Sequence, residues 1–475
     1  MVSLLSSMPV IILPAINFLL LPLYLKLLDP SEFAVYNLLS NLSGLLAIVV
    51  GFRIGAAILP YFKEYNTNEN TIYRFMVSII KYILNFSIVA ILIAAVAGPF
   101  IFKIIFKSEA FNFYPNGLMA VLTGIATALE LAVIIFLRNQ KNFFLLTKIQ
   151  MIAVGVNVSL QLILLLFFSK SATSLLIART IAAFILPAFF ILKFLLPYWH
   201  FDIDKQALKK CLKFSMPLVI WLVISWITIS FDRYYFEWIL ADNLKILGAY
   251  VLLLMIVAPI SLIGDTVINN IQPYIYDHYS QPSERGYRLV NNYFTIYIYL
   301  LLLFSSFIIL IATNLNLFTN KKEYLDIVMY IPLATLTHLF QGYSYVFRTT
   351  MIFNKASKKI SVFSVYSLIL LLILYFLLIP RFFIWGAIAA LIIDGIFSSV
   401  GFYFLSAGDK TMRFNIKGIF GYPTFLWLIL LFCFYYFRQF TFFNIVYWGI
   451  LQLIIIATIF FIKLKQFNTV GKQDI

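Results

Sequence analysis

The residues best suited to chemistry are a few ionisable groups inside long apolar runs. Asp394 and His338 both stand near the middle of such a run, and Ser398 follows Asp394 by one helical turn. A charge at the bilayer centre costs roughly 3 kcal/mol on insertion scales, so such groups face a cavity, pair with a cation or carry a proton. We therefore expect Asp394 and His338 to be candidates for coupling to H⁺ or Na⁺. Hydrogen bonding within a packed interior is the alternative for both.

Motifs of the common soluble enzymes are missing from the chain. The sequence has no P-loop, HExxH, CxxC or GxSxG pattern, and its two cysteines, Cys211 and Cys433, are far apart. Two distant cysteines give no framework for a metal or a disulfide. We expect no catalytic residue, no metal and no cofactor, and we predict that the protein is not an enzyme.

The elements that must hold these residues are apolar helices. Hydrophobic residues make up 63% of the chain and charged residues 11%, whereas soluble domains carry about 25% charged residues. Lipid leaves an open chain no spanning structure other than the helix. The sequence predicts an all-α polytopic membrane protein of about 14 transmembrane helices. The predicted spans are 3–25, 36–60, 76–102, 116–138, 146–168, 173–196, 214–239, 246–272, 291–312, 325–347, 360–380, 384–405, 418–437 and 442–463.

The distribution of Lys and Arg predicts the orientation. One set of alternate loops holds 22 of the 35 basic residues, counting Arg348 as a loop residue, and the other set holds 9. The richer side is cytoplasmic by the positive-inside rule, so both termini are expected in the cytoplasm. The net charge of +16 is then explained by topology, and we expect no nucleic-acid partner.

A short acidic turn occurs twice, with six predicted spans between its copies. One copy is Leu28–Tyr36 and the other is Leu240–Tyr250, and both end in a small residue, one further residue and a tyrosine. This pattern indicates a parallel repeat of two six-helix lobes that open a central cavity alternately to each side. We expect one lobe in 1–200, a second in 201–410, and two additional helices with a short cytoplasmic tail in 411–475.

These segments carry a family resemblance. The residues that carry it are Leu28–Tyr36, Gly51-Phe52-Arg53-Ile54-Gly55 and Tyr61-Phe62 in the first lobe, and Phe214–Leu218, Asp232-Arg233-Tyr234 and Gly248-Ala249-Tyr250 in the second. With these residues the chain resembles the O-antigen and capsule flippases (Wzx type) of the multidrug/oligosaccharidyl-lipid/polysaccharide exporter superfamily. Ala34 departs mildly from the family, which often has glycine there.

The resemblance implies a function and partners. Such proteins export undecaprenyl-pyrophosphate-linked oligosaccharide repeat units across the bacterial plasma (inner) membrane for surface polysaccharide, whether O-antigen, capsule or exopolysaccharide. A cation gradient is the expected energy source. The implied partners are the lipid-linked glycan, membrane lipid, a polysaccharide polymerase and a chain-length regulator.

Arg53 and Arg179 are the candidates for binding the substrate's pyrophosphate. A guanidinium presents a fork of donors that matches phosphate oxygens. The alternative is that each arginine forms an ion pair inside the protein. Four further charges are expected in ion pairs that line the cavity or form gates: Glu130, Asp265, Asp232 and Arg233.

Two other functions stay open. A multidrug exporter of the same fold would favour an acidic, aromatic cavity, whereas the first lobe contributes Arg53 and Arg179 against Glu130. A membrane-embedded polysaccharide polymerase or acyltransferase would favour a longer outward loop with catalytic Arg or His.

Overall fold

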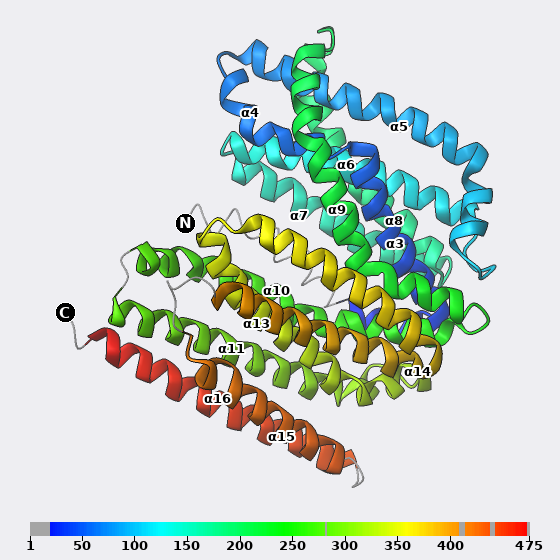
Figure 1. Cartoon of the computed structure of the whole chain (residues 1–475). Helices are drawn as coiled ribbons and strands as arrows, with labels where there is room; N and C mark the ends of the chain where they lie inside the picture. The colour runs from blue at the N-terminus through cyan, green and yellow to red at the C-terminus, as the bar shows by residue number, and fades with distance from the viewer. Residues whose placement is uncertain (1–19, 281–282, 408–413, 438–441, 473–475) are drawn as a thin grey trace. The chain divides into compact units, whose positions relative to one another are not determined.

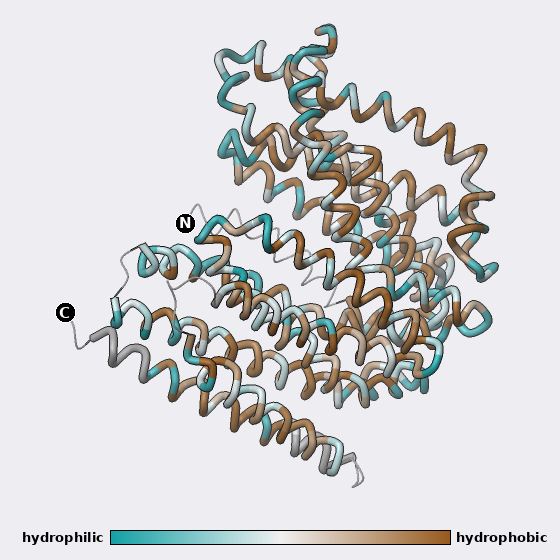
Figure 2. Tube along the Cα trace, viewed as in Figure 1, coloured by the Kyte–Doolittle hydropathy of each residue, from teal (hydrophilic) through white to brown (hydrophobic). Residues whose placement is uncertain are grey.

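The computed structural model describes residues 20–280, 283–407, 414–437 and 442–472, and within these ranges the chain is helical with no strand. Ten helices in this part of the chain are long and apolar enough to cross a membrane. Apolar residues follow their lengths, and hydrophilic residues gather at the turns (Figures 1 and 2). The protein is therefore an all-α, multi-pass membrane protein. The first predicted span, 3–25, lies almost entirely outside the described residues.

Contacts divide the chain into two compact units, Met1–Gly248 and Ala249–Ile475. In the first unit α6 packs against α3, α5, α7 and α8. Small residues on α6 allow this close packing: a Cβ on Gly124 would lie 2.7 Å from the Leu46 side chain of α3. The helices of this unit are α2 (Leu21–Leu27), α3 (Pro30–Gly51), α4 (Ile58–Tyr65), α5 (Glu69–Ile105), α6 (Leu118–Asn139), α7 (Phe143–Phe167), α8 (Ala172–Phe190) and α9 (Lys205–Ile239).

The second unit is built around α13, which packs against α14 and α11, while α11 also packs against α16. Its helices are α10 (Leu244–Ser280), which begins in the first unit, α11 (Glu284–Ala312), α12 (Lys322–Leu325), α13 (Ile331–Phe353), α14 (Ser357–Ala407), α15 (Tyr422–Phe437) and α16 (Phe442–Lys472).

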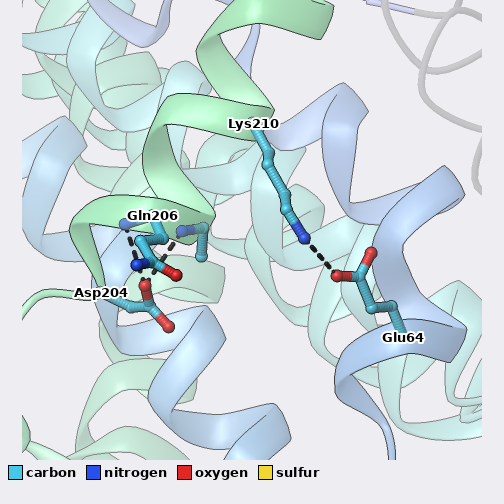
Figure 3. Close-up of polar contacts among 5 residues, drawn as sticks. Glu64, Asp204, Gln206 and Lys210 are labelled. Atoms are coloured by element: carbon cyan, nitrogen blue, oxygen red, sulfur yellow. Dashed lines mark hydrogen bonds and ion pairs between the residues drawn. The ribbon is translucent and has the colours of Figure 1, made fainter.

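Helix α9 belongs with the first unit by its contacts. Asp204 caps its N-terminus by accepting from the backbone N–H groups of Gln206 (3.0 Å) and Ala207 (2.9 Å). One turn on, Lys210 pairs with Glu64 of α4 at 2.5 Å (Figure 3). Both are exposed, so this ion pair adds little stability. The expected lobe boundary at residue 200 stays a prediction.

Helix α14 is two antiparallel helices joined by a tight turn. Phe383 interrupts it with a left-handed φ of 48°. Ser367 before this break contacts Asp394 and Ser398 after it, although 27 residues of straight helix would separate Ser367 from Asp394 by about 40 Å. The two halves therefore correspond to the predicted spans 360–380 and 384–405.

Helix α13 begins six residues later than the predicted span 325–347. Pro332 stands in its first turn, where a proline lacks no hydrogen bond that the helix needs. The shift moves Arg348 from a loop, where the sequence analysis placed it, into the helix. It also moves His338 towards the N-terminal end of the helix and puts Gln341 close to the middle.

The two copies of the repeated turn lie against each other. Lys245 approaches the Asp29 carboxylate at 4.0 Å. Gly248 is so close to α3 that a Cβ there would lie 1.9 Å from the Pro30 carbonyl oxygen. Only glycine fits this contact, which accounts for the small residue in the second copy.

Candidate functional site

Arg53 lies in a break between α3 and the short helix η1 (Ile54–Ala57). Phe52 and Arg53 both adopt left-handed conformations, with φ of 44° and 50°. Gly55 is pressed against α6, since a Cβ there would lie 2.9 Å from the Cα of Ala132. Non-helical backbone at membrane depth is tolerated where it is buried or lines a water-filled cavity. Arg53 is partly buried, and its carbonyl accepts a hydrogen bond from Ser215 of α9 at 3.3 Å.

A buried polar cluster occupies the interior of the first unit. The Tyr24 hydroxyl of α2 donates to Oε1 of Gln161 at 2.5 Å, and Nε2 of Gln161 donates to Asn157 at 3.1 Å. Tyr24 and Gln161 are fully buried. Gln150, Asn157 and Gln161 recur at spacings of seven and four, so one face of α7 is polar.

Glu130 and Arg179 border this cluster. Gln150 interacts with the Glu130 carboxylate, and Arg179 of α8 is an electrostatic neighbour of both Glu130 and Tyr24. Both charged residues are partly buried. Glu130 and Arg179 therefore lie in one region, but no nitrogen of Arg179 comes within 4 Å of the Glu130 carboxylate oxygens. Arg53 has different neighbours from these two residues. The binding of pyrophosphate by Arg53 and Arg179 stays a prediction.

Asp232 and Arg233 lie in the C-terminal part of α9, where a polar seam joins this helix to the rest of its unit. Asp232 is buried and Arg233 partly buried. Their gate role is untested. The seam consists of Trp226 and Ser230 donating to Asn41, Tyr234 donating to the Leu38 carbonyl, Trp238 donating to the Ile105 carbonyl, and Glu237 accepting from two backbone N–H groups.

Glu237 was not among the predicted site residues. It is fully buried, and its carboxylate accepts from the backbone N–H of Lys107 at 3.0 Å and of Ser108 at 2.6 Å. These two groups follow the end of α5. A glutamate near the end of a predicted span is expected at the membrane interface. No sequence pattern around Glu237 therefore indicates this contact.

Asp394 contacts Ser367, and Ser367 in turn contacts the predicted Ser398. Its Oδ1 accepts from the Ser367 hydroxyl at 2.5 Å, and Ser367 is 2.9 Å from the hydroxyl of Ser398. Asp394 and both serines are partly buried, at the middle of the α14 hairpin. One carboxylate and two hydroxyls provide oxygen ligands suited to a small hard cation or a proton.

His338 and Asp265 belong to one polar chain in the second unit. Tyr345 interacts with the Asp265 carboxylate of α10 and with Gln341, and Gln341 also interacts with His338. Arg348 is an electrostatic neighbour of Asp265. Gln341, Tyr345 and Arg348 were not among the predicted site residues. Their spacing from His338 of three, seven and ten residues, which marks one helix face, was the available signal.

An apolar cavity of about 250 Å³ lies on the other side of α13. Its walls come from α13, the second half of α14, the short helix η7 (Lys417–Gly421) with the residue before it, and the start of α15. The lining residues are Phe340, Tyr343, Phe347, Ile396, Ser399, Val400, Tyr403, Ile416, Phe420 and Thr424.

Ion pairs and metal clusters are scarce in the described part of the chain. Its two ion pairs, Lys210–Glu64 and Lys245–Asp29, involve exposed side chains. Among these same residues no group of three or more His, Cys, Asp or Glu side chains is arranged to hold a metal.

Comparison with solved structures identifies the architecture. A structure described as lipid II flippase MurJ in an inward closed conformation matches with a TM-score of 0.76 at 17% identity, covering 97% of this chain and 99% of that one. An inward-facing multidrug resistance MATE family transporter of the MOP superfamily gives a TM-score of 0.60 at 12% identity, covering 83% and 94%. A MATE structure in complex with MaD3S gives 0.51 at 12% identity, covering 85% and 93%.

The sequence itself matches no family model and no curated protein. At such low identities the structural likeness establishes the fold alone. The chain has the fold shared by this flippase and these transporters, and its structural neighbours are transport proteins.

Proposed function

We propose that this chain is an exporter that moves undecaprenyl-pyrophosphate-linked oligosaccharide repeat units across the bacterial plasma membrane. It would work by alternating access, with both termini in the cytoplasm, and would supply surface polysaccharide biosynthesis. The fold of a lipid II flippase over nearly the whole chain supports this proposal, as does the family resemblance of the sequence motifs.

The observation that carries the proposal is the two-sided character of α13. Phe340, Tyr343 and Phe347 line the apolar cavity, whereas Gln341 and Tyr345 lie on the nearly opposite polar side, as the helical period requires. An amphiphile with a hydrocarbon tail and a polar head matches such a helix better than a uniformly polar or apolar solute does. The cavity is suited to part of the tail, because its walls are mostly apolar and aromatic.

Charged groups are assigned in the same proposal. Arg53 and Arg179 bind the pyrophosphate, Asp394 with Ser367 and Ser398 couples transport to H⁺ or Na⁺, and Asp232 with Arg233 contributes to a gate. A polymerase and a chain-length regulator act on the exported unit.

Multidrug export is the second candidate, because MATE transporters share the fold. A pump for organic cations needs uncompensated acidic groups in its binding region. Among the candidate residues of the first unit, Arg53 and Arg179 outnumber the single acid Glu130, which lies near Arg179. This excess of cations favours the lipid-linked substrate. An enzymatic role has no such support from the structural neighbours.

The test is a deletion strain in which surface polysaccharide and the sidedness of undecaprenyl-linked repeat units are measured. We expect loss of surface glycan, with single units accumulating on the cytoplasmic leaflet. Units accumulating on the outer leaflet would indicate failed polymerisation instead. Unchanged glycan together with increased drug sensitivity would replace the proposal with drug export.

A further inference from the structure

Helix α13 is a transmembrane-length helix that is too polar to face lipid. It has 23 residues, yet it is absent from the ten apolar helices of the described chain. His338, Gln341, Tyr345 and Arg348 lie on one face over about 15 Å of its length. Gln341, near the middle, is exposed, and the other three are partly buried. An amide exposed to hydrocarbon would lose its hydrogen bonds, so this face borders water.

The neighbours of these side chains form a series that reaches α10. Tyr345 interacts with the Asp265 carboxylate and with Gln341, and Gln341 interacts with His338. The Nδ1 atom of His338 is buried without a hydrogen-bond partner. Because Gln341 is exposed near the middle of the helix, its amide can both donate to and accept from an external ligand.

Arg348 completes the face without adding net charge. Its guanidinium lies over the rings of Tyr345 and Phe402, 5.4 Å and 5.7 Å from their centroids, and neighbours Asp265. A cation held by two rings and balanced by a carboxylate has little charge left for a ligand. The face as a whole offers neutral donors and acceptors beside aromatic rings.

We propose that this face of α13 binds the sugar portion of the lipid-linked substrate, with Gln341 and Tyr345 contacting sugar hydroxyls. His338, Asp265 and Arg348 are positioning residues that hold those two side chains. The inference rests on the proposed function and names the part of the substrate that this face recognises. A pyrophosphate would require an uncompensated cation and an organic cation an uncompensated acid. An uncharged polyhydroxyl group requires the balanced set that is present.

Binding measurements on the purified full-length protein test this assignment. The probes are the undecaprenyl-pyrophosphate-linked repeat unit extracted from the deletion strain, undecaprenyl pyrophosphate without sugar, and the free oligosaccharide released from its carrier. Gln341→Ala and Tyr345→Phe should each weaken binding of both glycan-bearing probes about fivefold, as expected for a neutral hydrogen bond. Binding of the bare carrier should not change.

Ser344→Ala is the matched control, since its hydroxyl bonds to the Phe340 carbonyl and Ser399 rather than facing the polar side. Equal weakening of all three probes by Gln341→Ala, or no weakening of any, overturns the sugar assignment even if wild-type protein flips the carrier. Oligosaccharide binding that depends on Gln341 in a protein that does not flip the carrier would instead remove the proposed function and keep the sugar assignment.

The positioning role of His338 has its own test. His338→Gln retains a donor towards Gln341, whereas His338→Leu removes it. We expect His338→Leu to lose the preference for the glycan-bearing carrier over the bare carrier, and His338→Gln to restore it. Loss of preference in both variants, with unchanged thermal stability, would overturn this role.

Discussion

Each unit of the protein holds a polar cluster, and these two clusters differ in their exposure. In the first unit Tyr24 and Gln161 are fully buried and bonded to each other. In the second, Gln341 is exposed beside partly buried Tyr345 and His338. Buried, satisfied polar groups specify a packed interior, whereas exposed ones at membrane depth can bind a solute. The comparison predicts that substitutions in the buried Tyr24–Gln161 pair cost stability, whereas substitutions of Gln341 and Tyr345 cost function.

The largest expected loss of stability is at Glu237. Glu237→Ala leaves the backbone N–H groups of Lys107 and Ser108 without their acceptor, and we expect the free energy of unfolding to fall by about 3 kcal/mol. Thermal unfolding in detergent measures it. Glu109→Ala, at an exposed residue of the same turn, is the control and should change little. Equal stability of the two variants would mean that the α9 seam does not hold this helix.

Gln161→Leu should lower the free energy of unfolding by about 2 kcal/mol, because it leaves the buried Tyr24 hydroxyl without its acceptor. Adding Tyr24→Phe should recover part of the loss, and a double-mutant cycle isolates this pair. Unchanged stability with reduced transport in Gln161→Leu would contradict the comparison, since the buried cluster would then be functional.

Alanine substitutions at two glycines of the first unit should change stability by smaller amounts and in opposite directions. Gly55→Ala should destabilise by about 1.5 kcal/mol, because its Cβ would lie 2.9 Å from the Cα of Ala132. Gly44→Ala in α3 meets nothing within 4 Å and should stabilise by up to about 1 kcal/mol through helix propensity. Thermal unfolding of both variants checks the signs. A stable Gly55→Ala would mean that the break around Arg53 is not pinned to α6.

Most of the helical architecture could be predicted from hydropathy and from the residues at turns. The Pro380–Phe383 turn separates two apolar runs, and the hairpin of α14 follows. The register of α13 was harder to predict, because apolar residues continue before Pro332 into a segment that folds as short helices. That six-residue shift hid Arg348 among loop charges.

The candidate site was predictable only where depth alone makes a residue unusual. Asp394 is such a residue, and its serine Ser398 lies one turn away on the same helix. Ser367 comes from the other half of the hairpin, so no local pattern reveals it. Glu237 and its backbone partners are more than 100 residues apart, and only the tertiary structure joins them.

The smallest effect on stability and the clearest effect on function are expected at Asp394. Asp394→Asn keeps an oxygen that can accept from Ser367, so the free energy of unfolding should change by less than about 1 kcal/mol. It removes the charge that a bound Na⁺ or proton would neutralise. In proteoliposomes, flipping of the lipid-linked repeat unit by this variant should no longer respond to a Na⁺ or pH gradient. Ser398→Ala, which keeps the carboxylate, should retain a weakened response. A gradient response of wild-type size in Asp394→Asn would place the coupling site elsewhere, and a large loss of stability would make Asp394 structural, like the buried groups of the first unit.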